Sequence, residues 1–81
     1  MTDETPSWDA ELDAVGLICP LPVLKARKAL LPMERGAVLC LVASDPAAVI
    51  DVPHFCAEAG HDFLGVEETA EGVRRYLIRR G

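Results

Sequence analysis

A cysteine at position 19, followed by proline, one residue and a second proline, is the part of this sequence best suited to carry chemistry. It lies in the segment Gly16-Leu17-Ile18-Cys19-Pro20-Leu21-Pro22-Val23, where an extended apolar stretch meets a helical pattern. The first N–H groups of a helix have no partner within it, and with the helix dipole they favour negative charge. We therefore expect the pKa of the Cys19 thiol to be lowered towards neutrality, so that its thiolate acts as a nucleophile.

The two prolines stiffen the backbone beside this sulfur. Pro20 suits the first helical position, where its missing N–H costs nothing, and Pro22 makes the first turn irregular or moves the helix start by one or two residues. Leu21 is then the nearest N–H donor. The alternative interpretation is a cysteine that only packs, because free cysteines are among the most buried residues; the junction and the prolines favour the reactive thiol.

The apolar pattern predicts six elements in the order β-α-β-α-β-β. We expect strands at residues 11–15, 38–43, 61–67 and 73–79, and helices at residues 20–31 and 46–59. The last two strands are joined by a short polar turn, so they form an antiparallel hairpin. Because βαβ connections are right-handed, both helices lie on the same side. The predicted fold class is α/β, a two-layer α/β sandwich with a four-stranded mixed sheet and both helices on one face.

The two helices carry their own signals. Val23, Ala26 and Leu30 repeat at helical spacing and form the expected buried stripe of the first helix. Ser44-Asp45-Pro46 is a helix start with a Ser or Asp cap, and Gly60 ends the second helix. One interpretation of Pro53 is that it splits this helix, with Asp51 capping the second part. The expected apolar stripe of the second helix is Val52, Phe55, Cys56 and Ala59.

The other two cysteines fall in apolar patterns, so we expect Cys40 and Cys56 to pack in the core. An odd number of cysteines without a signal peptide indicates free thiols in a reducing cytosol. A thiol redox protein remains an alternative if one of these cysteines lies near Cys19 in space. His54, Cys56 and His61 have no standard zinc spacing, so we predict no metal site.

The length of the chain and the distribution of its charges indicate how it is organised into segments. A chain of 81 residues without an apolar run of membrane-spanning length predicts one domain and no membrane helix. The first 13 residues hold five of the 13 acids and no base, so the remaining eight acids balance the eight bases. We expect residues 1–10 to be an acidic flexible N-terminus, with Trp8 either docked or exposed, and residues 11–81 to be the domain.

A neutral body argues against nucleic acid as the main ligand, which needs a basic surface. The arginines near the end of the chain form a local basic cluster, so a regulatory or RNA-binding module remains an alternative. These residues are Arg74, Arg75, Arg79 and Arg80.

The segment from Gly16 to Pro22 resembles the Cys-Pro-x-Pro signature of the TusA/SirA-like sulfur carrier family. The segment Ser44-Asp45-Pro46, residues 51–56 and residues 75–79 resemble the same family in the same order. The resemblance covers residues 11–81 and is strongest to the TusA branch, through the Phe55-Cys56 pair and the C-terminal segment.

The resemblance implies a cytoplasmic sulfur carrier. Cys19 would take sulfane sulfur as a persulfide from a cysteine desulfurase or a rhodanese-like donor and pass it to a downstream acceptor protein. In relatives the sulfur goes to 2-thiouridine of tRNA, to the molybdenum cofactor or into sulfur oxidation. Such a sulfurtransferase-type relay is a carrier rather than a multi-turnover enzyme.

The resemblance implies no cofactor beyond the covalent persulfide, no membrane and no direct nucleic acid partner, and we expect a monomer. Only Cys19 carries over as a chemical residue. Lys25, Arg27 and Lys28 either dock partners or form a solvated helix face.

Overall fold

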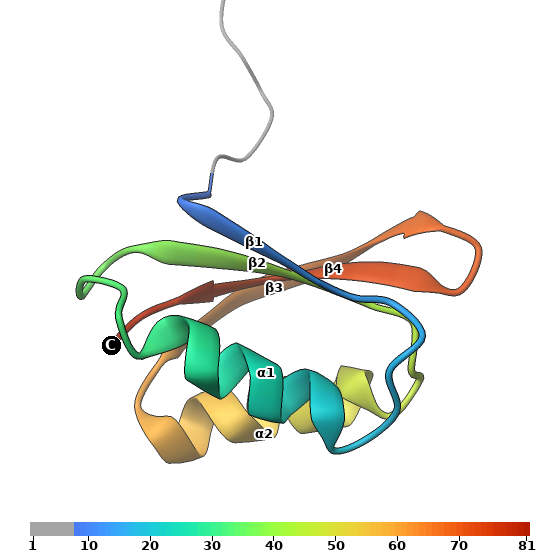
Figure 1. The fold of residues 1–81 in the computed structure, drawn as a ribbon, viewed down its shortest axis with the longest axis horizontal. Coiled ribbons are helices and arrows are strands. Elements are labelled where there is room, and N and C mark those ends of the chain that lie inside the picture. The colour runs from blue at the N-terminus through green and yellow to red at the C-terminus, as the bar shows by residue number, and fades with distance from the viewer. Residues whose placement is uncertain (1–7) are drawn as a thin grey trace, which may run out of the picture.

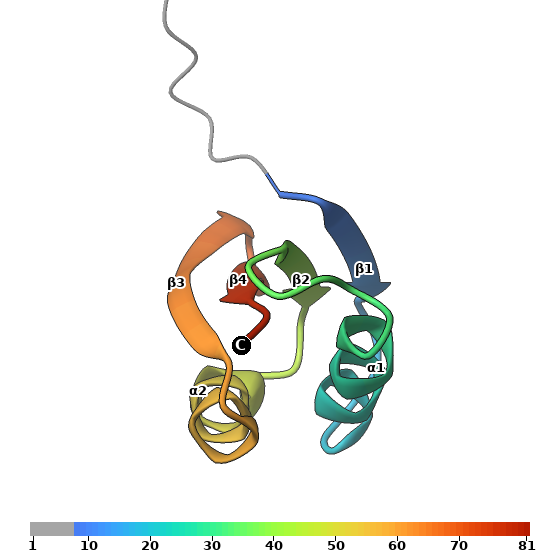
Figure 2. The ribbon, with the colours of Figure 1, turned by 90° about the vertical axis from the view of Figure 1, so that its left-hand side faces the viewer.

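Four strands and two helices make up the computed structural model, which describes residues 8–81. The elements follow one another as β1 (Ala10–Ala14), α1 (Leu21–Leu30), β2 (Val38–Ala43), α2 (Ala48–Ala59), β3 (Asp62–Ala70) and β4 (Val73–Arg79). The sheet order is β1-β2-β4-β3; β1 and β2 are parallel, and the other neighbours are antiparallel. Both helices cover one face of the sheet (Figures 1 and 2). The predicted fold class is confirmed.

The predicted acidic segment, residues 1–10, falls mostly outside the described residues, which begin at Trp8; Ala10 already belongs to β1. Within residues 8–81, neither helix has the length and apolar character needed to cross a membrane.

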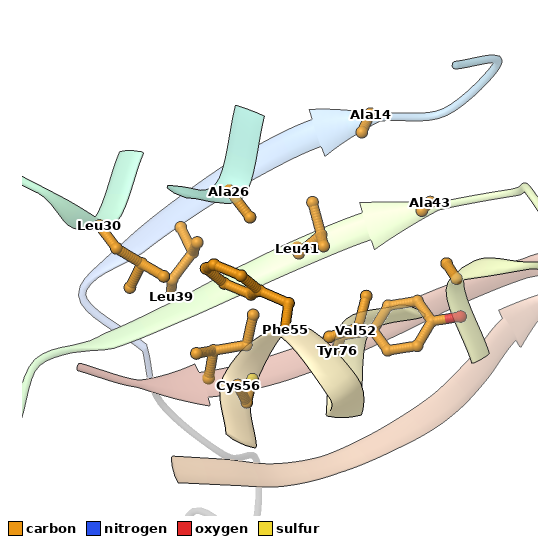
Figure 3. Close-up of a cluster of buried hydrophobic side chains, with 12 residues drawn as sticks. Ala14, Ala26, Leu30, Leu39, Leu41, Ala43, Val52, Phe55, Cys56 and Tyr76 are labelled. Atoms are coloured by element: carbon orange, nitrogen blue, oxygen red, sulfur yellow. The ribbon is translucent and has the colours of Figure 1, made fainter. Parts of the chain in front are cut away.

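The core lies between β2 and β4 on one side and the two helices on the other. Alternation places Leu39, Leu41 and Ala43 of β2 towards the helices, and all three are buried. The other members of this buried cluster, most of them labelled in Figure 3, are Ala14, Ala26, Leu30, Ala48, Val52, Phe55, Cys56, Tyr76 and Ile78. Burying a side chain of the size of Leu41 contributes about 1.5–3 kcal/mol, so this cluster holds both helices on the sheet.

Tyr76 brings a polar atom into this core. Its side chain is fully buried, and its hydroxyl has no hydrogen-bond partner of acceptable geometry within the described residues. Burial raises the pKa of Tyr76, and the nearby Arg74 guanidinium lowers it in part. The Arg74 side chain does not meet the geometry of a hydrogen bond to the hydroxyl. This hydroxyl therefore carries an uncompensated desolvation cost.

The start of α1 lies within the predicted shift of one or two residues, whereas the start of α2 differs from the prediction. α1 begins at Leu21 with Pro20 as its N-cap, and Pro22 is buried, whereas the predicted core residue Val23 is only half-buried. α2 begins at Ala48, because the residues before it form a tighter turn: the Ala48 N–H donates to the Asp45 carbonyl at 3.0 Å.

α2 is one continuous helix, so the interpretation that Pro53 splits it is wrong. Pro53 removes only the N–H that would donate to the carbonyl of Val49, and Val49 lies at the exposed surface, where water can replace that donor. Gly60 ends the helix in the left-handed conformation (φ 82°), as predicted. The predicted stripe residue Ala59 is exposed, because it lines an open hollow between the ends of the two helices.

The hairpin is longer than the sequence suggested. β4 has the predicted bounds, but β3 continues to Ala70, beyond the predicted end at residue 67. Glu67 and Glu68 pair with Arg75 and Arg74 across the hairpin, so pairing with β4 extends a strand whose own sequence is polar.

Candidate functional site

The loop that carries Cys19 is held by the loop after β2. Because parallel strands end at the same edge of a sheet, the chain after β1 and the chain after β2 lie side by side (Figure 1). The Gly16 N–H donates to Ser44 Oγ at 2.9 Å, and the Cys19 N–H donates to Asp45 Oδ2. Asp45 Oδ1 also accepts from the Ala47 N–H at 3.1 Å. This carboxylate therefore fixes the Cys19 backbone and the turn that leads into α2.

Cys19 itself is exposed and immediately precedes the N-cap residue of α1. The Leu21 N–H, expected to face the sulfur, donates instead to the Ile18 carbonyl at 2.9 Å. Pro20 and Pro22 have no N–H at all. The first turn of α1 therefore offers the sulfur fewer donors than an ordinary helix N-terminus does.

The thiol lies in a hollow of about 210 Å³ between the two helices, called the thiol hollow below. Its walls are Cys19, Pro20, Val23 and Arg27 from one side and Asp51, His54, Phe55 and Glu58 from α2. Apolar packing of Val52 and Phe55 fixes α2 against the sheet and so presents the carboxylate of Asp51 to the same hollow.

The electrostatics of the thiol hollow contradict one prediction. Hydrogen-bond attraction of the thiol proton to the Asp51 side chain, followed by desolvation and the charges of Asp51 and Asp45, raises the pKa of Cys19 above its ordinary value, although this pair does not meet the geometry of a hydrogen bond in the structure. The prediction of a lowered pKa is wrong, because it considered only the helix that Cys19 begins. Two carboxylates from the α2 side act more strongly on the sulfur than the depleted N-terminus of α1.

The other two cysteines have a different environment. Cys40 and Cys56 are buried, as predicted, and all three thiols are free. Desolvation first, and then a nearby carboxylate, raises the pKa of each of the two to about 11. Neither is therefore an accessible resolving thiol for Cys19. No group of three His, Cys, Asp or Glu side chains in residues 8–81 is arranged to hold a metal ion.

The predicted docking cations separate into two groups. Lys25 and Lys28 line a shallow surface hollow with Leu12 and Ala29. Arg27 instead lines the thiol hollow, and its guanidinium carbon lies 5.2 Å from the centre of the Phe55 ring. Of the three, only Arg27 adjoins the thiol hollow.

The C-terminal arginines do not form one open patch. Arg75 pairs with Glu67 at 3.2 Å and also stacks on Trp8, which is docked, and Arg79 pairs with Asp62 at 3.0 Å. The Arg80 Nε donates to the Leu30 carbonyl at 3.0 Å. These contacts engage most of the arginines in the cluster. The basic surface that an RNA-binding module would need is therefore largely occupied.

His61 lies near the same end of the molecule. Its Nδ1 accepts from the Gly81 N–H at 3.0 Å, and burial, followed by the charges of Arg80 and Arg27, lowers its pKa.

Asp51 is a neighbour of the thiol that was not predicted. Its only signal was its place in residues 51–56, one of the segments that resembled the family. The contact depends on how α2 packs beside α1, and no local pattern specifies that arrangement.

Two comparisons with known proteins agree with this geometry. Residues 10–80 match the family described as Sulfurtransferase TusA. The crystal structure of a SirA-like protein from Desulfitobacterium hafniense is similar with a TM-score of 0.80 and 27% sequence identity, over 90% of this chain and 99% of that chain. The match extends from β1 to the end of β4 and includes the Cys-Pro-x-Pro segment. The chain therefore belongs to the TusA family of sulfurtransferases.

Proposed function

We propose that this protein is a sulfur carrier that holds sulfane sulfur as a persulfide on Cys19 and relays it from a donor protein to an acceptor protein. The observation that carries the proposal is the exposed Cys19 thiol, fixed at its backbone by Asp45 within the Cys-Pro-x-Pro segment of a sulfurtransferase family. Cys40 and Cys56 are buried, so Cys19 is the thiol that a partner can reach.

Sulfur transfer needs no cofactor in this scheme. The Cys19 sulfur attacks the outer sulfur of a donor persulfide, a new S–S bond forms at Cys19, and the donor S–S bond breaks to leave the donor as a thiol. Each acceptance breaks one S–S bond and forms one, so no oxidant or reductant is consumed. Delivery repeats the exchange, with the acceptor thiolate attacking the outer sulfur and Cys19 leaving.

The surface beside the thiol suits a protein partner. Ile18 and Leu24 flank the motif and are 69% and 50% exposed, and Ile50 on the first turn of α2 is 75% exposed. An exposed apolar side chain directly next to a reactive thiol, as Ile18 is, suits contact with a protein. Suitable donors are a cysteine desulfurase or a rhodanese-like protein. The acceptor routes suggested by the resemblance are tRNA thiolation, molybdenum cofactor maturation and sulfur oxidation.

The chemistry fits a reducing compartment such as the cytoplasm, where a free, exposed thiol is preserved. A monomer would leave the thiol hollow open to each partner in turn.

The test is intact-mass measurement after incubation with a cysteine desulfurase and cysteine. The native chain should gain about 32 Da, the mass of one sulfur atom, and a reductant should remove it, as for other reversible cysteine modifications. Cys19→Ser should gain nothing, whereas a variant with Cys40→Ser should still be loaded. Failure of the native chain to gain sulfur from this donor, and from thiosulfate with a rhodanese, would count against the carrier.

A further inference from the structure

The open hollow between the C-terminal ends of the two helices, called the basic hollow below, has a volume of about 300 Å³. It lies at the end of the molecule where the chain leaves β4, beside the C mark in Figure 1. Arg27, His61 and Arg80 line it, and none of the residues that form its walls is acidic. Its charge is therefore opposite to that of the thiol hollow, which Asp51 and Glu58 line.

The buried ring of Phe55 sets the positions of two of these side chains. The guanidinium carbon of Arg27 lies 5.2 Å from the centre of this ring, and the centre of the His61 ring lies 5.6 Å from it. Arg80 reaches the hollow from the end of β4, where its Nε donates to the Leu30 carbonyl at 3.0 Å. Three elements far apart in the sequence thus bring nitrogen donors to one place.

Each of the three side chains keeps a donor that the protein does not use. The Gly81 N–H donates to His61 Nδ1 at 3.0 Å, so the proton of the neutral ring lies on Nε2. Arg80 Nη1 donates to the Gly81 carbonyl at 2.7 Å, and Nη2 makes no bond within residues 8–81. Among the same residues, Arg27 makes no salt bridge. Two positive charges and one neutral donor are therefore available to a ligand.

The carbonyl groups at the helix ends do not account for these cations. Such groups carry partial negative charge and attract basic side chains. At the end of α2 the Cys56 carbonyl already accepts from two backbone N–H groups, at 3.0 and 2.9 Å. At the end of α1 the Leu30 carbonyl accepts from the Met33 N–H at 3.1 Å and from Arg80. Of the three side chains, only Arg80 serves a helix carbonyl.

We propose that the basic hollow binds a small tetrahedral oxyanion, such as sulfate or phosphate, through Arg27, Arg80 and His61. An ion with four oxygens can accept from donors that come from three sides, and charged donors make the stronger bonds. A hollow of about 300 Å³ has room for such an ion and several waters, each of which fills about 30 Å³. The inference does not depend on the proposed function, because the two hollows share only Arg27 and Phe55.

The protonation of His61 should respond to the bound anion. Burial and the charges of Arg80 and Arg27 lower the pKa of His61, and Asp62 on β3 acts in the opposite direction. An anion in the basic hollow offsets the two guanidinium charges, so it should raise the pKa of His61. By linkage, the anion should bind more tightly when His61 is protonated.

The experiment follows the histidine rings by NMR as sodium sulfate is added near neutral pH, with sodium chloride of equal ionic strength as the reference. The chain has two histidines, and His54, which is exposed and lies 3.5 Å from Glu58, is the internal control. The His61 ring signal and the Gly81 amide signal should shift along a saturating curve in sulfate only, whereas the His54 signal should not saturate. The pKa of His61 should be higher in sulfate than in chloride.

Two variants test which charges matter. Arg27→Gln should weaken sulfate binding about two- to five-fold, the range expected for the loss of one exposed charge interaction. Lys28→Gln removes the same charge one residue further along α1, from the shallow hollow that Leu12 lines, and should bind sulfate like the native chain. Equal responses to the two salts without saturation would overturn the proposal, and so would equal affinities of Arg27→Gln and Lys28→Gln.

Discussion

Replacing Asp45 by alanine should separate the two loops that hold Cys19. The change removes the acceptor for the Cys19 N–H and the acceptor for the Ala47 N–H. Losing the acceptor within the turn before α2 costs about 0.5–1.5 kcal/mol, as for an ordinary hydrogen bond. A further hydrogen bond to a charged group contributes about 1.5–3 kcal/mol, less where it is half-exposed. We expect the free energy of unfolding to fall by about 2–3 kcal/mol, which lowers Tm by roughly 8–24 °C for a chain of this size.

Asp13 is the matched control for this change. Its Oδ1 accepts from the Val15 N–H at 3.0 Å, two residues on, in the way that Asp45 accepts from Ala47, but it makes no bond across to the Cys19 loop. Equilibrium urea unfolding followed by circular dichroism should show a loss of less than about 1 kcal/mol for Asp13→Ala, as for a local, exposed acceptor. Equal losses in Asp45→Ala and Asp13→Ala would refute the idea that Asp45 joins the two loops.

Three further predictions follow from burial and charge. Tyr76→Phe should be at least as stable as the native chain in urea, by up to about 1 kcal/mol, because it removes an unsatisfied buried hydroxyl; a large loss would reveal a partner. Iodoacetamide at pH 8 should modify the folded chain once, at Cys19, and the unfolded chain three times, because burial raises the pKa of Cys40 and Cys56 to about 11. The lowered pKa of His61 means that the unfolded chain binds its proton more readily, so stability should be full above about pH 6.5 and fall below it. His61→Gln should show a flatter dependence of Tm on pH over this range, and an unchanged slope would contradict the assignment.

The sequence predicted best the elements that their own side chains specify. β2 and β4 have the predicted bounds, because Val38–Ala43 is an unbroken apolar run, and Val73–Arg79 follows a polar turn and places the buried Tyr76 and Ile78 two residues apart. The end of β3 could not be predicted in this way, since Glu68 and Ala70 are exposed and are held by the partner strand.

Only the position of the reactive cysteine along the chain could be predicted from the sequence. The position of Cys19 before a helix follows from the prolines that come next to it, and its exposure agrees with a reactive thiol. The direction of its pKa shift was mispredicted, because the group with the largest influence, Asp51, is on another helix. Helix dipoles can be inferred from sequence order, whereas the side chain that faces a sulfur depends on tertiary packing.

The strand order also determines which part of the molecule opens first. β1 and β3 are the two edge strands, and β1, which pairs only with β2, is the shorter of them, with five residues against nine. Native proteins open in cooperative units of unequal stability, and edge elements with few partners belong to the weaker ones. Detaching β1 would also release Gly16 and Cys19 from the loop after β2, while the β2–β4–β3 sheet keeps its pairing. The amide hydrogens of Leu12, Gly16 and Cys19 should therefore exchange with solvent as one group, ahead of those in β2 and β4.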